Sequence, residues 1–155
     1  MIVIECNNDE FLIKSFGFSR KEISHQRCKG EVIKKVGKLS AAIGIIDEDP
    51  QSIQPGDLKK YKVIRAQGDL KLFTGRNDKS KKIILISPYL EHWIINRTKS
   101  NKINVKYYNL PVNPKKLHDI PHLERNKGFQ KLLRELIESD VEFKCLKNWI
   151  KEALE

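Results

Sequence analysis

The chain of 155 residues has few cysteines and no long apolar run. Its three cysteines, Cys6, Cys28 and Cys145, are an odd number, lie far apart and form no Cys-x-x-Cys pair. This pattern argues against a disulfide framework and against a zinc site, and it favours a reducing compartment. No apolar run reaches the roughly 18 residues that a membrane span requires. The first residues have the pattern of a strand rather than of a secretory signal. We therefore expect a cytoplasmic protein that has no membrane partner.

Acidic residues are scarce relative to basic ones. Twenty Asp and Glu stand against thirty Lys and Arg, which gives a net charge of +10. Such an excess favours polyanionic partners, with nucleic acid first and an acidic membrane surface second. The basic residues are spread along the chain, so no basic tail separates from the fold. The tyrosines show no aromatic interleaving of the kind that marks a single-strand stacking platform.

Hydrophobic periodicity predicts an α/β fold with a central, mainly parallel sheet, flanking helices and a helical C-terminal end. We expect a single domain over 1–155, with a core over about 1–95 and a C-terminal helical extension over about 96–155. The expected strands are 2–5, 22–25, 41–46, 61–66, 70–74 and 81–87. The expected helices follow Asn7 or Asn8 as a cap, Lys29 and Pro88, and cover 129–137 and about 141–154. The stretch 98–126, with three prolines, is expected to be an irregular connection.

The stretch from Ala41 to Pro50, AAIGIIDEDP, is the strongest local signal. An unbroken apolar run predicts a strand buried on both faces, and three acids follow it directly. Ligands of open α/β sheets bind at the carboxyl ends of the strands, so these acids are placed for a cation. Oxygen-only ligands favour Mg²⁺ or Mn²⁺ over zinc. If the backbone stays extended, Asp47 and Asp49 share a side, and Glu48 turns away into an outer role.

A second acid stands at the end of another predicted strand. Glu5 follows the first apolar run, and the ends of parallel strands point the same way, so Glu5 is expected to converge with Asp47 and Asp49. His25 and Lys29 follow the second strand on the same edge, where they could bind phosphate or assist proton transfer. The alternative is that they form a solvated basic turn.

Two further residues near these motifs have competing interpretations. Glu91, with His92 beside it, could reach the metal site, or it could only begin a helix, because the helix dipole favours an acid there. Cys6 lies beside Glu5 but has no evident histidine partner, so we interpret it as a small buried apolar residue rather than a nucleophile.

Together these motifs resemble the Toprim domain, the catalytic module of topoisomerases, bacterial-type primases and several nucleases. The matching segments are IVIECNND (2–9), GIIDEDP (44–50) and, more weakly, PYLEHWI (88–94). The resemblance covers roughly residues 1–95. It implies that Glu5 is the family's glutamate, that Asp9 is the acid that commonly follows it, and that Asp47 and Asp49 form the Asp-x-Asp pair. The third segment supplies Glu91, as an acid does in several nuclease-like members.

The chain departs from the family pattern in two respects. Cys6 stands where the family usually has glycine, which bears on the shape of that loop. The long DNA-binding insertions and the cleavage tyrosine of topoisomerases are absent, which argues against a topoisomerase.

The resemblance implies a Mg²⁺-dependent enzyme that acts on nucleic-acid phosphodiesters, most simply a small nuclease. Glu5, Asp47 and Asp49 would be catalytic and metal-binding, and Glu91 would be a further metal ligand. His25 and Lys29 are expected to support catalysis because they follow the second strand at the same edge. Two alternatives stay open. One is a non-catalytic nucleic-acid-binding or regulatory module that works with a larger protein partner such as an ATPase. The other is a nucleotidyltransferase closer to primase.

Overall fold

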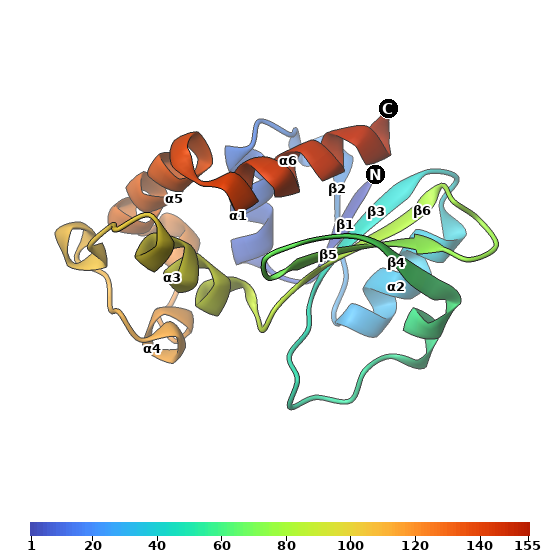
Figure 1. The fold of residues 1–155 in the computed structure, drawn as a ribbon, viewed down its shortest axis with the longest axis horizontal. Helices are drawn as coiled ribbons and strands as arrows, with labels where there is room; N and C mark the ends of the chain where they lie inside the picture. The colour runs from blue at the N-terminus through green and yellow to red at the C-terminus, as the bar shows by residue number, and fades with distance from the viewer.

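Six strands form one mixed sheet with helices on both faces (Figure 1). The computed structural model describes residues 1–155. The strand order is β2-β1-β3-β6-β5-β4, in which the first four neighbours run parallel and the last two add antiparallel pairing. The bounds are β1 Ile2–Ile4, β2 Ile23–His25, β3 Ala42–Asp47, β4 Tyr61–Gln67, β5 Leu70–Gly75 and β6 Lys81–Ile86. The predicted α/β class, with a mostly parallel sheet, is confirmed.

The helices account for most of the remaining chain. They are α1 Asn7–Ser15, α2 Lys29–Lys38, α3 Leu90–Ser100, α4 Pro114–His118, α5 Lys127–Ser139 and α6 Val141–Leu154. The predicted helical C-terminal end is present. The structure differs from the prediction at α4, which lies inside the connection expected to be irregular. No helix has both the length and the apolar character needed to cross a membrane.

Alternation along the strands divides the core into two layers. Ile43 and Ile45 of β3 join the larger cluster, which includes residues of α1, α3, α5 and α6. Ala42 and Ile46 of the same strand face the opposite way, into a smaller cluster beneath α2. Figure 1 shows α2 on one side of the sheet and α6 on the other. β3 is therefore buried on both faces, as the unbroken apolar run predicts.

Gly44 allows α2 to approach β3 closely. A Cβ atom at this position would lie 2.8 Å from Cδ1 of Ile83 and 2.9 Å from Cγ1 of Val32. Real Cβ atoms essentially never come so near another heavy atom. The glycine in the middle of the apolar run thus determines how deeply the helix sits on the sheet.

Buried ion pairs connect the C-terminal helices to the sheet. Arg97 of α3 contacts Asp140 (Nη2–Oδ1 2.7 Å) and Glu142 (Nη1–Oε2 2.6 Å), and both acids are almost fully buried. Asp140 also caps α6 by accepting hydrogen bonds from the first-turn amides. The backbone N–H of Asp69, in the turn between β4 and β5, donates to Oε1 of Glu142 at 2.7 Å. One polar cluster thereby joins α3, α6 and the hairpin.

β4 is an edge strand with an irregular register. It pairs only with β5, and its register shifts between Val63 and Arg65. Val63 and Ile64 are about half exposed. The bulge leaves one residue of this strand without a partner on β5.

Candidate active site

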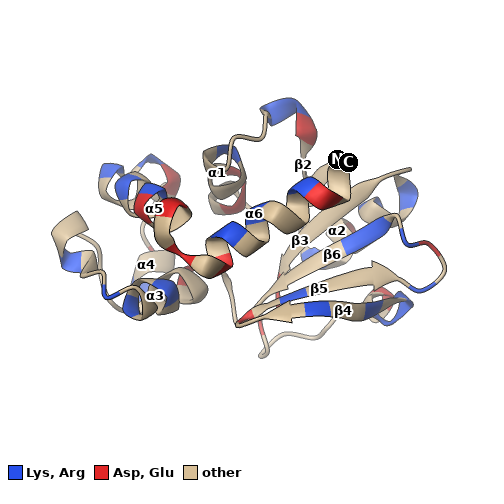
Figure 2. Ribbon diagram, turned by 45° about the horizontal axis from the view of Figure 1, so that its top comes forward, with Lys and Arg blue, Asp and Glu red and all other residues tan.

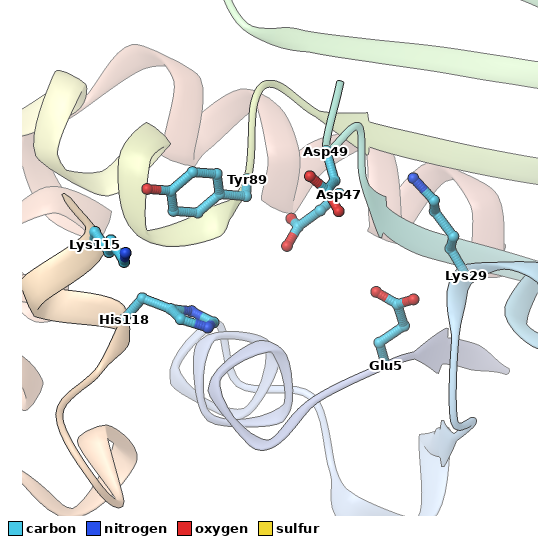
Figure 3. A pocket seen from close by; sticks show the side chains of 7 residues that line it. All are labelled: Glu5, Lys29, Asp47, Asp49, Tyr89, Lys115 and His118. Atoms are coloured by element: carbon cyan, nitrogen blue, oxygen red, sulfur yellow. The ribbon is translucent and has the colours of Figure 1, made fainter. Parts of the chain in front are cut away.

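A cavity of about 320 Å³ opens at the carboxyl ends of the parallel strands (Figure 3). Its lining residues are Glu5, Lys29, Asp47, Asp49, Tyr89, Lys115 and His118. Glu5 directly follows β1, Asp47 ends β3, and Lys29 begins α2 after β2. The structure therefore brings together four of the residues selected from the sequence, because their strands run parallel and end at one edge.

The turn after β3 places Asp49 differently from the expectation. Asp49 has a φ of 43°, so the backbone is left-handed there rather than extended. Its N–H donates to the carbonyl of Pro88 at 2.7 Å, which ties the turn to the start of α3. Asp47 and Asp49 share the cavity because of this turn and not because of strand alternation. Glu48 points elsewhere, and its Oε2 accepts a hydrogen bond from the Ser87 hydroxyl at 2.8 Å.

Lys29 holds this turn in place. Its ammonium donates to the carbonyl of Glu48 (2.8 Å), to the Ser52 hydroxyl (2.7 Å) and to Oε1 of Gln54 (3.3 Å). A lysine ammonium has three N–H donors, so these acceptors use all of them. Lys29 lies in the cavity as expected, but it acts as a positioning residue with no donor left for a phosphate.

Two carboxyl groups of the cavity, those of Glu5 and Asp47, resist ionisation because they are buried. Burial, and then the charges of Asp9, Glu91 and Glu5, raise the pKa of Asp47 to about 9. Burial also raises the pKa of Glu5, and the nearby Lys29 opposes that rise. Oδ1 of Asp47 accepts the N–H of Leu90 at 3.0 Å, at the start of α3. A cation bound among these carboxyl groups would offset the repulsion between them.

Asp9 lies buried behind this group and organises the start of α1. Burial raises its pKa to about 6, with Glu91 and Glu5 adding to the rise and hydrogen bonds from Cys6 opposing it. The N–H of Cys6 donates to Oδ2 of Asp9 at 3.1 Å, and the Cys6 sulfur accepts the N–H of Asp9 at 3.4 Å. Cys6 is therefore the helix cap, in place of the expected Asn7 or Asn8. It lies at the surface and not in the core, which corrects the interpretation of a buried apolar residue.

Glu91 is not among the residues that line the cavity. It is 3% exposed, and both of its oxygens are engaged. Oε1 accepts the side-chain amide of Asn8 at 2.9 Å, and Oε2 lies 3.2 Å from Nδ1 of His118. The structure thus gives Glu91 a role behind the cavity wall, where it influences Asp47 through charge.

His25 does not reach the cavity either. Its Nε2 pairs with Glu10 of α1, which also pairs with Lys14 and Arg20. The cause is strand alternation. Ile23 faces the core that contains α1, so His25, two residues later, faces the same side. The predicted catalytic role of His25 has no geometric support here.

Sequence reasoning missed three residues of the cavity wall, namely Tyr89, Lys115 and His118. The ring of Tyr89 lies 6.2 Å from that of His118 at an interplanar angle of 74°. Lys115 and His118 belong to α4, whose N-terminal signal was present in the sequence. Oδ1 of Asn113 accepts the N–H of Lys116 at 3.0 Å, and proline occupies the first helical position.

The donor set fits a hydrated divalent ion better than a preformed protein cage. No three His, Cys, Asp or Glu side chains stand close enough to hold a metal ion directly. The carboxylates that face the cavity are Glu5, Asp47 and Asp49, all of them oxygen donors. Mg²⁺ keeps several of its waters and is commonly bound through one or two carboxylates. These residues therefore suit a partly hydrated Mg²⁺ or Mn²⁺ and do not suit zinc.

Other basic residues gather at the opposite end of the sheet. Lys60, Arg76 and Lys81 line a separate cavity of about 230 Å³, near the start of β6. Figure 2 shows blue segments at that end and also on the helices elsewhere in the molecule. β6 runs parallel to β3, so its start lies away from the carboxylates. These charges do not border the candidate active site.

The chain was compared with protein-family models, with curated proteins and with solved structures, and no match was found.

Proposed function

We propose that this protein carries out Mg²⁺-dependent phosphodiester chemistry on nucleic acid, as a small nuclease of Toprim type. One observation carries the proposal. Glu5 and the Asp47–Asp49 turn come from two different strand ends, and they line one cavity together with cationic residues. The net charge of +10 supports a polyanionic substrate.

The residues of the cavity have distinct roles in this proposal. A bound Mg²⁺ would neutralise charge on the phosphate oxygens and lower the pKa of an attacking water. Asp47 and Asp49 would hold the hydrated ion, and Lys29 fixes the turn that carries them. Glu5 would accept the proton of the attacking water as the new P–O bond forms, because burial raises its pKa towards neutral pH. The P–O bond to the leaving sugar oxygen would break in the same step, and solvent water would protonate that oxygen.

A second candidate is a non-catalytic nucleic-acid-binding module that works with a larger protein. The observation that favours it is the absence of three side chains close enough to hold a metal directly. Such a module would bind nucleic acid with a strong salt dependence and would form no products.

Calorimetric titration of Mn²⁺ and Mg²⁺ tests the metal site. We expect the wild type to bind and the double variant Asp47→Ala/Asp49→Ala to lose the binding. The matched control is Glu48→Ala, which removes an acid of the same turn whose side chain bonds Ser87 and does not line the cavity. Equal weak binding by all three proteins would contradict the metal site.

Cleavage assays then separate the two candidates. Single- and double-stranded DNA and RNA are incubated with Mn²⁺ and with chelator. A nuclease gives metal-dependent products that are absent with the double variant. Binding without products, at every metal concentration that saturates the calorimetric site, would favour the non-catalytic module.

A further inference from the structure

We propose that α4 provides a nucleotide subsite in which Lys115 binds a phosphate of a single-stranded substrate and the rings of Tyr89 and His118 support the adjoining nucleoside. This inference rests on the proposed function and extends it, since it names residues that bind the strand next to the reacting phosphate. Figure 3 shows Lys115, His118 and Tyr89 on one side of the cavity, across from Glu5 and Lys29.

The first argument concerns charge. A phosphate that enters the cavity meets the carboxyl groups of Glu5, Asp47 and Asp49, and those that are ionised repel it. Two lysines line the cavity, and the donors of Lys29 are all used by the turn after β3. The ammonium of Lys115 lines the cavity and makes no hydrogen bond or ion pair within the protein, so it is the cation that remains for a phosphate.

The second argument concerns rigidity. α4 is short, but Leu117 in its middle is fully buried in the larger core, and the side chain of Asn113 caps its start. The backbone that carries Lys115 and His118 is therefore fixed at the cavity wall. Lys116 lies on the same helix without lining the cavity, which makes the wall position specific to Lys115 and His118.

The third argument concerns the rings. His118 is held from behind by the buried Glu91, which Asn8 holds in turn. The rings of Tyr89 and His118 meet nearly at right angles, so they form a corner at the cavity wall. Aromatic surfaces of this kind support bases without reading their identity. The cavity volume of about 320 Å³ is at the low end for ligand pockets, which suits one nucleotide.

The test measures binding of a short fluorescein-labelled oligothymidylate by anisotropy, in chelator so that no cleavage occurs. We expect Lys115→Ala to weaken binding about tenfold, as for loss of a charged hydrogen bond. The slope of log affinity against log salt should fall by about 0.7, the value for one phosphate contact on a single strand. Lys116→Ala is the matched control and should change the slope little. Equal losses in both variants would overturn the subsite, because α4 would then act only as diffuse positive charge.

The rings have their own readout. An oligonucleotide of the same length in which every position is abasic should bind the wild type less tightly than the oligothymidylate does. The difference should be about fivefold or more, because the abasic strand has no bases to stack on the rings. His118→Ala should remove this difference, whereas His122→Ala, whose residue lies outside this cavity, should keep it. A difference that persists in His118→Ala overturns the role of that ring.

Failure of this inference and failure of the proposed function can be told apart. Mn²⁺ calorimetry on Lys115→Ala should match the wild type, since the lysine holds no metal. Metal binding with no specific effect of Lys115 overturns the subsite and leaves the metal site. A specific effect of Lys115 in a protein that binds no metal supports the subsite and overturns the nuclease.

Discussion

At the scale of single residues, the position of Asp47 favours binding of a cation but disfavours ionisation of its own carboxyl group. Its place at the end of β3 suits a cation, yet the same burial raises its pKa to about 9, with help from Asp9, Glu91 and Glu5. Without a cation, the folded chain holds a proton here that the unfolded chain releases above about pH 4. Stability is therefore lost as pH rises from there through the folded-state pKa.

We expect Asp47→Asn to stabilise the metal-free protein at pH 7 to 8. The amide cannot ionise, and it keeps the oxygen that accepts the N–H of Leu90. The gain in the free energy of unfolding should be at least about 1 kcal/mol, or about 2–4 °C in Tm for a chain of this size. Thermal unfolding in chelator across pH 4 to 9 measures it. The wild-type Tm should fall across this range more steeply than that of the variant, and parallel curves would contradict the raised pKa.

At the scale of elements, the packing of α2 on β3 depends on one missing side chain. Gly44 leaves room for Ile83 and Val32, which a Cβ atom would approach within 3 Å. Both neighbours belong to the smaller core, which α2 covers together with Leu58. The distance between this helix and the sheet, and hence the position of Lys29 at its start, follows from this contact.

We expect Gly44→Ala to lower the free energy of unfolding by about 1–3 kcal/mol, the usual cost of overpacking. Gly37→Ala is the matched control, because Gly37 lies in α2 with nothing within 4 Å of an added Cβ. That variant should be neutral or more stable by about 0.5–1 kcal/mol, since alanine favours helix. Urea denaturation of both variants provides the comparison. A stable Gly44→Ala protein would show that α2 can shift.

The elements of the fold differ in how far the sequence predicts them. The apolar run before Asp47 by itself predicts a strand, because a strand buried on both faces must be apolar throughout. It also predicts the place of the acids, which follow the run directly. The cavity wall formed by Lys115 and His118 carries no such signal. Their position depends on Leu117 packing into a core assembled from distant elements. The cap at Asn113 and Pro114 could have revealed the helix, though not where it lies.

At the scale of the whole molecule, Arg97 connects α3 to the start of α6 and, through Glu142, to the hairpin of β4 and β5. Asp140 and Glu142 are each 1% exposed at the side chain, and Arg97 is 15% exposed. Glu142 also receives the N–H of Asp69 from the hairpin. Loss of the arginine would leave two buried carboxylates with no cation, which costs far more than the loss of a surface pair.

We expect Arg97→Met to lower the free energy of unfolding by about 3–5 kcal/mol. Arg65→Met serves as the control, because Arg65 and Glu152 form an ion pair in which both side chains are 51% exposed. That variant should lose no more than about 1 kcal/mol. Chemical denaturation followed by tryptophan fluorescence measures both, and similar losses would show that the buried cluster is not specially sensitive.

The edge of the sheet has a consequence for the protein at high concentration. An edge strand offers a row of unpaired backbone groups that can template the same strand of another copy, and the half-exposed Val63 and Ile64 make β4 a candidate for such growth. The shifted register interrupts that row, and Lys62 and Arg65 would bring like charges together in a stack of copies. We therefore expect the irregular register and these charges to oppose the growth of such a stack.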